Sequence, residues 1–162
     1  MRHTWWRIPA FCSIAGWVDY HIKVWLFGRW TVVTLPDGSI TIDDVKWAWL
    51  SFALMALTVV VGGQLICRSM TRREVFLSAS VLVGINIAAG LLFMQINNMA
   101  ALYWSQFTEW EGGVSRLLYR AGAPEWIITA IIWALPYLFV PFGRAGEKPA
   151  CGAAETAPNG TN

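Results

Sequence analysis

The chain has 162 residues, of which 56% are hydrophobic and only 14% are charged, and its formal net charge is +2. Soluble domains carry about 25% charged residues, so this composition argues against a soluble domain. The small net charge and the lack of a Lys/Arg-rich stretch set nucleic acid aside as a partner. The charges fall in clusters between long uncharged runs, as expected where hydrocarbon excludes ionised groups. The sequence therefore predicts an all-α polytopic membrane protein with the lipid bilayer as its first partner.

The first apolar segment, residues 8–27, is long enough to cross a bilayer but contains Asp19, His21 and Lys23. An Asp or Lys at a helix centre costs about 2.5–3.5 kcal/mol on insertion scales. Asp19 and Lys23 are spaced i,i+4 and can pair, and Lys23 can extend toward the outer headgroups. We expect a spanning helix here. A cleaved signal peptide and a helix lying on the membrane surface are the alternatives.

An outer loop is expected at residues 28–46. Residues 31–35 and 40–42 are rich in β-branched side chains and flank Pro36-Asp37-Gly38. Pro presets a turn, and Gly accepts the positive φ that closes it. This pattern predicts a short extracytoplasmic β-hairpin that rests on the membrane surface or on the second outer loop.

Three further spans are expected at residues 47–67, 75–95 and 126–143, each of them uncharged. Segments of about 20 residues match the thickness of the hydrocarbon layer. Together with residues 8–27 they predict a four-helix transmembrane bundle within a membrane domain at residues 1–143. Residues 144–162 have few large apolar side chains and are expected to form a disordered cytoplasmic tail.

The second outer loop, residues 96–125, contains Trp104, Phe107 and Trp110 at three-residue spacing. This spacing predicts that the third helix continues past the bilayer and lays an aromatic edge along the interface, until Gly112-Gly113 breaks it. Residues 115–121 are expected to form a short amphipathic helix that anchors the loop at the interface.

Positive charges set the expected orientation, because short cytoplasmic loops are enriched in Lys and Arg. The loop at residues 68–74 carries Arg68, Arg72 and Arg73, which predicts cytoplasmic N- and C-termini. We expect a multi-pass protein of the plasma membrane, of bacterial origin because the loops and termini are compact.

Small residues recur at four-residue spacing on the last three spans, which lets helix backbones approach closely. They predict helix packing, within the chain or between chains, at Thr58, Gly62, Ser80, Gly84, Ala88, Ala130 and Ala134.

Polar groups in hydrocarbon are candidates for function. The sequence offers an intramembrane polar site made of Asp19, His21, Lys23, Asn86 and Gln95. Such a site could handle protons or cations. The structural interpretation, which we favour, is that Asp19 and Lys23 neutralise each other and Asn86 hydrogen-bonds between helices.

No catalytic motif is recognisable, and two histidines, His3 and His21, do not supply a haem site in the bundle. We expect no metal and no cofactor, and we interpret Cys12, Cys67 and Cys151 as isolated thiols.

The leading hypothesis is a non-catalytic accessory, regulatory or assembly subunit that forms a homo-oligomer or binds a larger membrane partner. The alternative is a small transporter or channel component with a polar path around Asp19 and Asn86. A membrane enzyme would need an outer-face site built from Asp43, Asp44, Glu109 and Glu111, which fit a solvated rim better.

Overall fold

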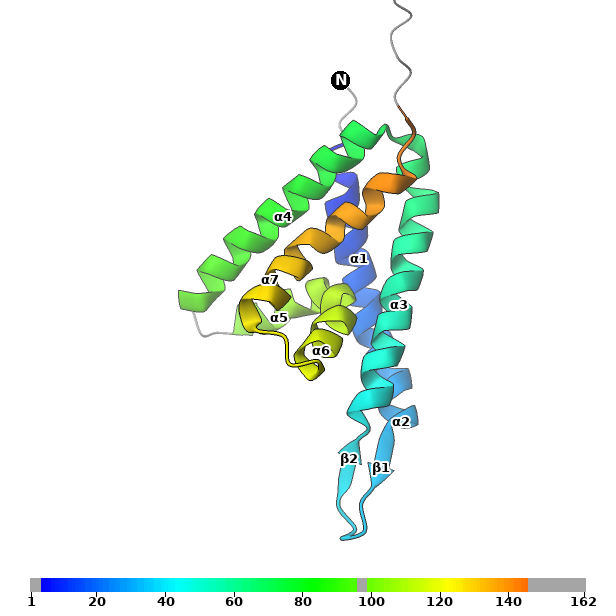
Figure 1. Cartoon of the computed structure of the whole chain (residues 1–162), viewed down its shortest axis with the longest axis vertical. Coiled ribbons are helices and arrows are strands. Elements are labelled where there is room, and N and C mark those ends of the chain that lie inside the picture. The colour runs from blue at the N-terminus through cyan, green and yellow to red at the C-terminus, as the bar shows by residue number, and fades with distance from the viewer. Residues whose placement is uncertain (1–3, 96–98, 146–162) are drawn as a thin grey trace, which may run out of the picture.

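The computed structural model describes residues 4–95 and 99–145, with side chains for all of these except residues 93–95 and 99–102. The described chain is mostly helical (Figure 1). Three helices are long and apolar enough to cross a membrane, namely Asp44–Ser69, Arg72–Leu92 and Glu125–Phe142. They coincide with the three uncharged spans expected from the sequence. The tail after Ala145 and the thiol of Cys151 lie outside the described residues.

The first apolar segment forms one uninterrupted helical stretch. α1 (Arg7–Ile22) passes directly into a π-helical turn, η1 (Lys23–Phe27), and then into the short α2 (Gly28–Trp30). Its buried residues follow the helical period and form one stripe along the helix, which consists of Ile8, Cys12, Gly16, Asp19, Lys23 and Phe27. The two ionisable members therefore face the interior of the protein.

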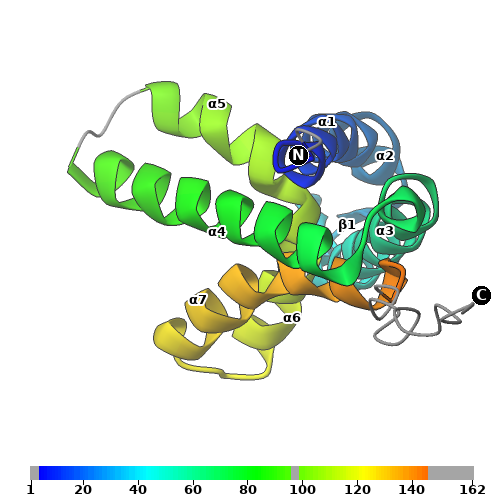
Figure 2. The ribbon, with the colours of Figure 1, turned by 90° about the horizontal axis from the view of Figure 1, so that it is seen from above.

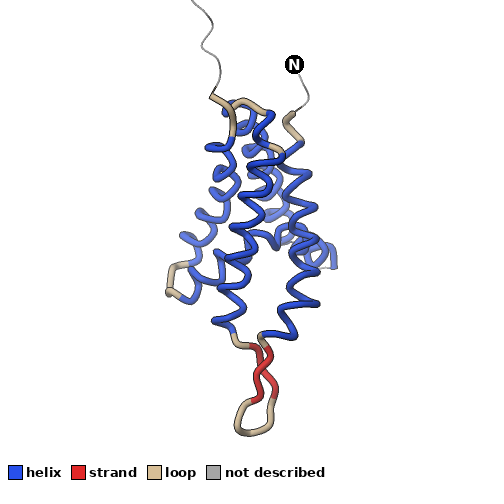
Figure 3. Tube along the Cα trace, turned by 90° about the vertical axis from the view of Figure 1, so that its right-hand side faces the viewer, coloured by secondary structure: helices blue, strands red, loops and turns tan. Residues whose placement is uncertain are grey.

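The predicted hairpin is confirmed. β1 (Val32–Thr34) pairs antiparallel with β2 (Ile40–Ile42), and the turn between them places Gly38 at φ 83°. The hairpin extends away from the helices at one end of the molecule (Figures 1 and 3) and its strands are largely exposed, so the expected contact with the second outer loop is wrong. We call this end the hairpin end.

Side-chain caps fix the starts of the next two helices. α3 (Asp44–Leu65) begins after Asp43, whose carboxylate accepts hydrogen bonds from the amides of Val45 and Lys46. After the short η2 (Cys67–Ser69), α4 (Arg72–Gln95) begins with a capping box in which Thr71 and Glu74 bond to each other's backbone amides.

The segment expected to be the second outer loop folds back between the helices instead. α5 (Met99–Thr108) packs along α1, the short η3 (Glu109–Glu111) forms a tip, and α6 (Gly112–Arg120) packs along α3 (Figures 1 and 2). We call residues 99–120 the inserted segment. Trp110, expected in an aromatic edge along the interface, is 1% exposed and belongs to the apolar core, so the prediction of such an edge is wrong for this residue.

Two glycines make this insertion sterically feasible. A Cβ atom at Gly16 of α1 would collide with the backbone of Phe107, and one at Gly113 of α6 would collide with the backbone of Ser51 and Phe52. Gly112-Gly113 therefore begins α6, whereas we expected it to end the preceding helix. Gly113 allows the close approach to α3, whereas Gly112 lies against the Glu109 side chain.

The last span is only partly α-helical. α7 (Glu125–Ala134) continues as a 3₁₀ helix, η4 (Leu135–Phe142), which contains Pro136 and Pro141. Proline lacks the amide that an α-helix requires, which explains the change of helix type. The backbone of Arg144 then bonds to Met70 and Arg72, so η4 ends beside η2 and the start of α1, opposite the hairpin end (Figure 3).

The core lies between α1, α3, α4, η4 and the tip of the inserted segment. Its buried residues include Ile8, Met55, Val75, Trp110 and Phe139, together with the free thiols of Cys12 and Cys67. The rings of Phe11 and Phe139 meet edge to face with centroids 6.1 Å apart.

Only part of the predicted small-residue packing occurs within the chain. Gly62 faces the rings of Phe11 and Phe139, and Ser80 lies 3.1 Å from the hydroxyl of Tyr137. Thr58 is half-buried, whereas no described neighbour lies within 4 Å of a Cβ placed at Gly84. The exposed members of the set are Gly84, Ala88, Ala130 and Ala134. For these positions packing between chains, the other form of the prediction, stays a prediction.

Candidate functional site

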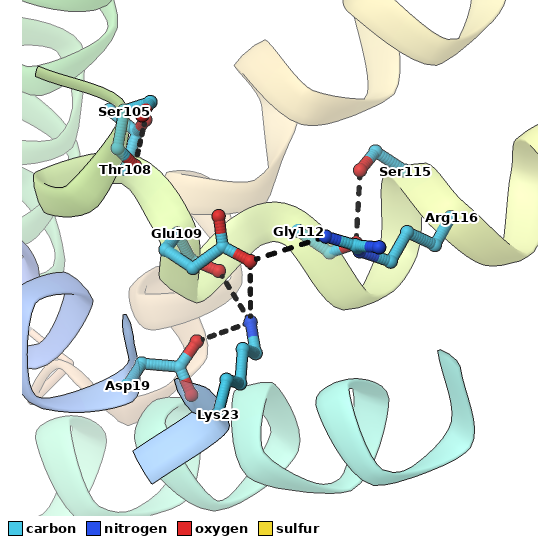
Figure 4. A network of polar contacts seen from close by, with 8 residues as sticks. All are labelled: Asp19, Lys23, Ser105, Thr108, Glu109, Gly112, Ser115 and Arg116. Carbon is cyan, nitrogen blue, oxygen red and sulfur yellow. Dashed lines mark hydrogen bonds and ion pairs between the residues drawn. The ribbon is translucent and has the colours of Figure 1, made fainter. Parts of the chain in front are cut away.

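The tip of the inserted segment and the end of α1 form a buried network of charges (Figure 4). The Lys23 ammonium lies 2.6 Å from Asp19 Oδ2, and both side chains are almost fully buried. The same ammonium lies 2.9 Å from the Glu109 carbonyl oxygen and 3.2 Å from Glu109 Oε1. Two of the three N–H donors of the ammonium thus bond to Glu109, and its charge pairs with Asp19.

Arg116 continues the network toward the surface. Its guanidinium lies 3.8 Å from Glu109 Oε1 and stacks over the Trp47 ring at 5.7 Å from the centroid. The side chain is 49% exposed, so this outer contact is the weaker one. Two carboxylates and two cations thus alternate from the interior to the surface, and their formal charges cancel.

The π-helical turn η1 begins at Lys23, the residue that connects α1 to the inserted segment. The Lys23 amide bonds to the carbonyl groups of both Asp19 and Tyr20, where α-helical bonding passes into the wider turn. Such turns recur at functional sites. Here the turn coincides with the point where the Lys23 side chain reaches the inserted segment.

Burial makes the pairing essential to the fold. A carboxylate and an ammonium removed from water lose several kcal/mol of hydration each, which their mutual attraction must offset. Asp19 Oδ2 lies within ion-pair distance of Lys23, but neither carboxylate oxygen has a hydrogen-bond partner in the described part of the chain. Losing Lys23 would therefore leave Asp19 buried without a partner.

Glu111, at the other side of the tip, lies in different surroundings. It is 4% exposed, and its Oε1 accepts a hydrogen bond of 3.3 Å from Asn86 Nδ2 on α4. No described cation lies within ion-pair distance of it. Burial raises the pKa of the Glu111 carboxyl from 4.5 to about 8, although the bond from Asn86 favours the ionised form. The tip is part of none of the three long apolar helices.

The structure divides the predicted polar site. The Asp19–Lys23 pair is confirmed, but Lys23 points inward to Glu109 and does not extend toward the headgroups. Asn86 meets Glu111 and not Asp19. The His21 ring packs against Trp17 and Tyr20, with centroids 4.4 and 5.4 Å away, and makes no polar contact with another described residue. The Gln95 side chain lies outside the described residues.

The carboxylates expected to form a solvated rim also separate. Asp43 caps α3 and Asp44 is exposed, but Glu109 and Glu111 turn inward. Both glutamates flank Trp110, whose indole is buried in the apolar core, and this burial brings its two sequence neighbours inward as well. In the sequence, the large apolar side chain of Trp110 between two glutamates and beside two glycines was the feature that could have indicated this burial.

In the part of the chain that the structure describes, no three His, Cys, Asp or Glu side chains converge as a metal site would require. Comparison of the chain with protein families, curated proteins and solved structures finds no match.

Proposed function

We propose that this protein is a four-span integral membrane protein that acts as a non-catalytic accessory subunit. The spans would be the stretch from α1 to α2, then α3, α4, and α7 with η4. The first stretch is the most polar of the four, and burial of its Asp19–Lys23 pair inside the protein supports a position in the bilayer. In that position the inserted segment would be a re-entrant element whose tip, at Trp110 and Glu111, is buried among the helices.

The proposed orientation places the hairpin outside and both termini in the cytoplasm, in a bacterial plasma membrane. Support comes from Arg68, Arg72 and Arg73, which lie at or beside η2, opposite the hairpin end (Figure 1). The Arg7 guanidinium also lies there, 3.0 Å from Ser69 Oγ.

The observation that carries the accessory role is the pairing of the Lys23 ammonium, which forms an ion pair with Asp19 and hydrogen-bonds to Glu109. A polar centre whose charges cancel is suited to hold the inserted segment in place. Its buried cation is held by groups of the protein itself, which argues against a role in binding a substrate or a transported ion. We therefore assign this centre a structural role and look for function on the outer faces of the helices.

One outer face of α4 has the features of a helix-docking surface. Gly84 and Ala88 expose backbone at four-residue spacing, and Leu91 and Leu92 beyond them are 63% and 61% exposed. Figure 1 shows this half of α4 inclined away from α1 and α3. Small residues let a second helix approach closely, so the proposed partner is a transmembrane helix of another copy or of a larger membrane protein.

The test is cross-linking in cells and co-purification in mild detergent. Gly84→Leu should abolish the cross-linked species without lowering the melting temperature, because no described neighbour lies near Gly84. Ala56→Leu, the same kind of change on an exposed face of α3, is the matched control. A wild-type protein that stays a monomer in cells and in detergent would refute the accessory role, and solubility without detergent would refute membrane insertion.

A second candidate, a small transporter or channel component, is favoured by Glu111 and Asn86. A buried carboxyl without a cation is suited to bind and release a proton. Its test is proton or solute flux in proteoliposomes, with Glu111→Gln expected to abolish the flux. Asp19→Asn is the companion variant for a path that includes Asp19. No flux above background by the wild-type protein would exclude this function.

A further inference from the structure

A cavity of about 660 Å³ lies at the hairpin side of the inserted segment. Its walls are one face of α6, one face of α7 and the start of α3. Pockets of ~300–1,000 Å³ are typical of sites for small ligands and headgroups. The lining residues are Asp44, Ser115, Arg116, Tyr119, Arg120, Glu125, Ile128 and Thr129.

Charges of both signs converge on this cavity. Arg116 is already engaged by Glu109 and by the Trp47 ring. Arg120, Asp44 and Glu125 make no ion pair in the described part of the chain. Water can satisfy an exposed charge by itself, but here one cation and two anions that have no described ion-pair partner converge around a single cavity.

This balance favours a ligand that carries both charges. A purely anionic ligand would meet Arg120 but would be repelled by Asp44 and Glu125. A phosphate joined by a short linker to an ammonium group would find a partner for each end, since guanidinium binds phosphate and carboxylates accept from ammonium.

The surroundings favour an amphiphile over a soluble zwitterion. Ile128 provides an apolar wall that is 9% exposed, on a helix apolar enough to cross a membrane. Tyr119 and Trp126, near the same junction of α6 and α7, are each 72% exposed. Exposed Tyr and Trp side chains are typical of the headgroup level of a bilayer.

We propose that this cavity binds the headgroup of a zwitterionic phospholipid of the phosphatidylethanolamine type, with its phosphate at Arg120 and its ammonium at Glu125 and Asp44. The inference rests on the proposed membrane insertion with this end outside. It does not depend on the helix-docking face of α4.

The experiment is native mass spectrometry of the full chain, purified in mild detergent and incubated with equal amounts of phosphatidylethanolamine and phosphatidylglycerol. The wild-type protein should retain one phosphatidylethanolamine molecule with about tenfold preference, since charge-assisted hydrogen bonds contribute on that scale. Arg120→Gln should lower retention about tenfold, and Glu125→Gln should remove the preference between the two lipids. Arg120→Lys should keep most of the binding. The matched control, Arg29→Gln, changes an exposed arginine at the same end and should have no effect.

Three results would overturn the proposal. The first is equal retention of both lipids by the wild-type protein. The second is unchanged retention in Arg120→Gln when the variant keeps the wild-type melting temperature. The third is displacement of the lipid by soluble phosphoethanolamine at equal concentration, which would assign the cavity to a soluble ligand. If lipid binding at this cavity is refuted, the expected cross-linking through Gly84 is unaffected. A protein that is soluble without detergent would instead refute the proposed membrane insertion.

Discussion

Glu109 and Glu111 lie two residues apart at the tip of the inserted segment and meet opposite surroundings. Glu109 is held by the Lys23 ammonium at 3.2 Å and by the more distant Arg116 guanidinium. Glu111 is more deeply buried and has one hydrogen bond, from the neutral Asn86 amide. For Glu109, two cations replace the water that burial removes. For Glu111 no described cation does so, and burial raises the pKa of its carboxyl, which favours the neutral form.

The difference shows how one short turn can fasten the inserted segment in two ways. On the α1 side the fastening is ionic and depends on the buried Lys23 cation. On the α4 side it is a single hydrogen bond whose strength depends on protonation. Changes to either side should therefore differ in size and in pH dependence.

The largest effect is expected from Lys23→Met. The substitution keeps the apolar stem but leaves Asp19 and Glu109 without their shared cation, and breaking a buried pair costs about 3–5 kcal/mol. Chemical unfolding in detergent measures the loss. Lys46→Met, which removes a cation that is 61% exposed, is the control and should be nearly neutral. Equal stability of Lys23→Met and the wild-type protein would mean that the network does not form.

The next effect is a pH dependence that belongs to Glu111. Because its pKa is raised in the folded protein, the stabilisation is complete below pH 4.5 and is lost as the pH rises to about 8. Across this window the loss is on the order of a few kcal/mol. Glu111→Gln resembles the neutral acid, so it should flatten this part of the stability profile. If Glu111→Gln kept the wild-type dependence of stability on pH, a group other than Glu111 would be responsible for it.

Gly113→Val should displace the tip and so weaken both the Lys23–Glu109 contact and the Asn86–Glu111 contact. Its side chain would collide with the backbone of Ser51 and Phe52, and overpacking of this kind costs about 1–3 kcal/mol. Thermal unfolding in detergent measures the effect. Gly84→Val, on a helix position with open space, is the matched control, and similar losses in both variants would argue against the close approach of α6 to α3.

The smallest effect is expected from Arg116→Gln. The guanidinium is half exposed and 3.8 Å from Glu109, and such contacts contribute less than about 1 kcal/mol. Thermal unfolding at low and high salt should differ little between this variant and the wild-type protein. A loss as large as that of Lys23→Met would show that the surface end of the network is the essential one.

Much of the backbone was predictable from local chemistry. The uncharged runs located α3, α4 and α7 with η4, the turn residues located the hairpin, and i,i+4 spacing located the Asp19–Lys23 pair. Each of these depends on residues that are close in sequence, where pattern and periodicity carry the information.

The inserted segment was not predictable in the same way. Trp110 has the same amphipathic chemistry whether it lies at a headgroup interface or in a core, so its position in the sequence does not distinguish the two. The deciding contacts, Lys23 with Glu109 and Asn86 with Glu111, join residues 86 and 25 positions apart. The need for a glycine at position 113 likewise becomes evident only when α3 is seen to lie beside it.

The coupling between Lys23 and Glu109 tests the central claim most directly, because these residues meet only if the tip is inserted beside α1. A double-mutant cycle of Lys23→Met and Glu109→Gln, measured by unfolding in detergent, isolates this contact. The account predicts a coupling energy of about 1–3 kcal/mol, with the double variant less damaged than the sum of the single variants. Additive losses would contradict it, because they would mean that Lys23 and Glu109 do not meet.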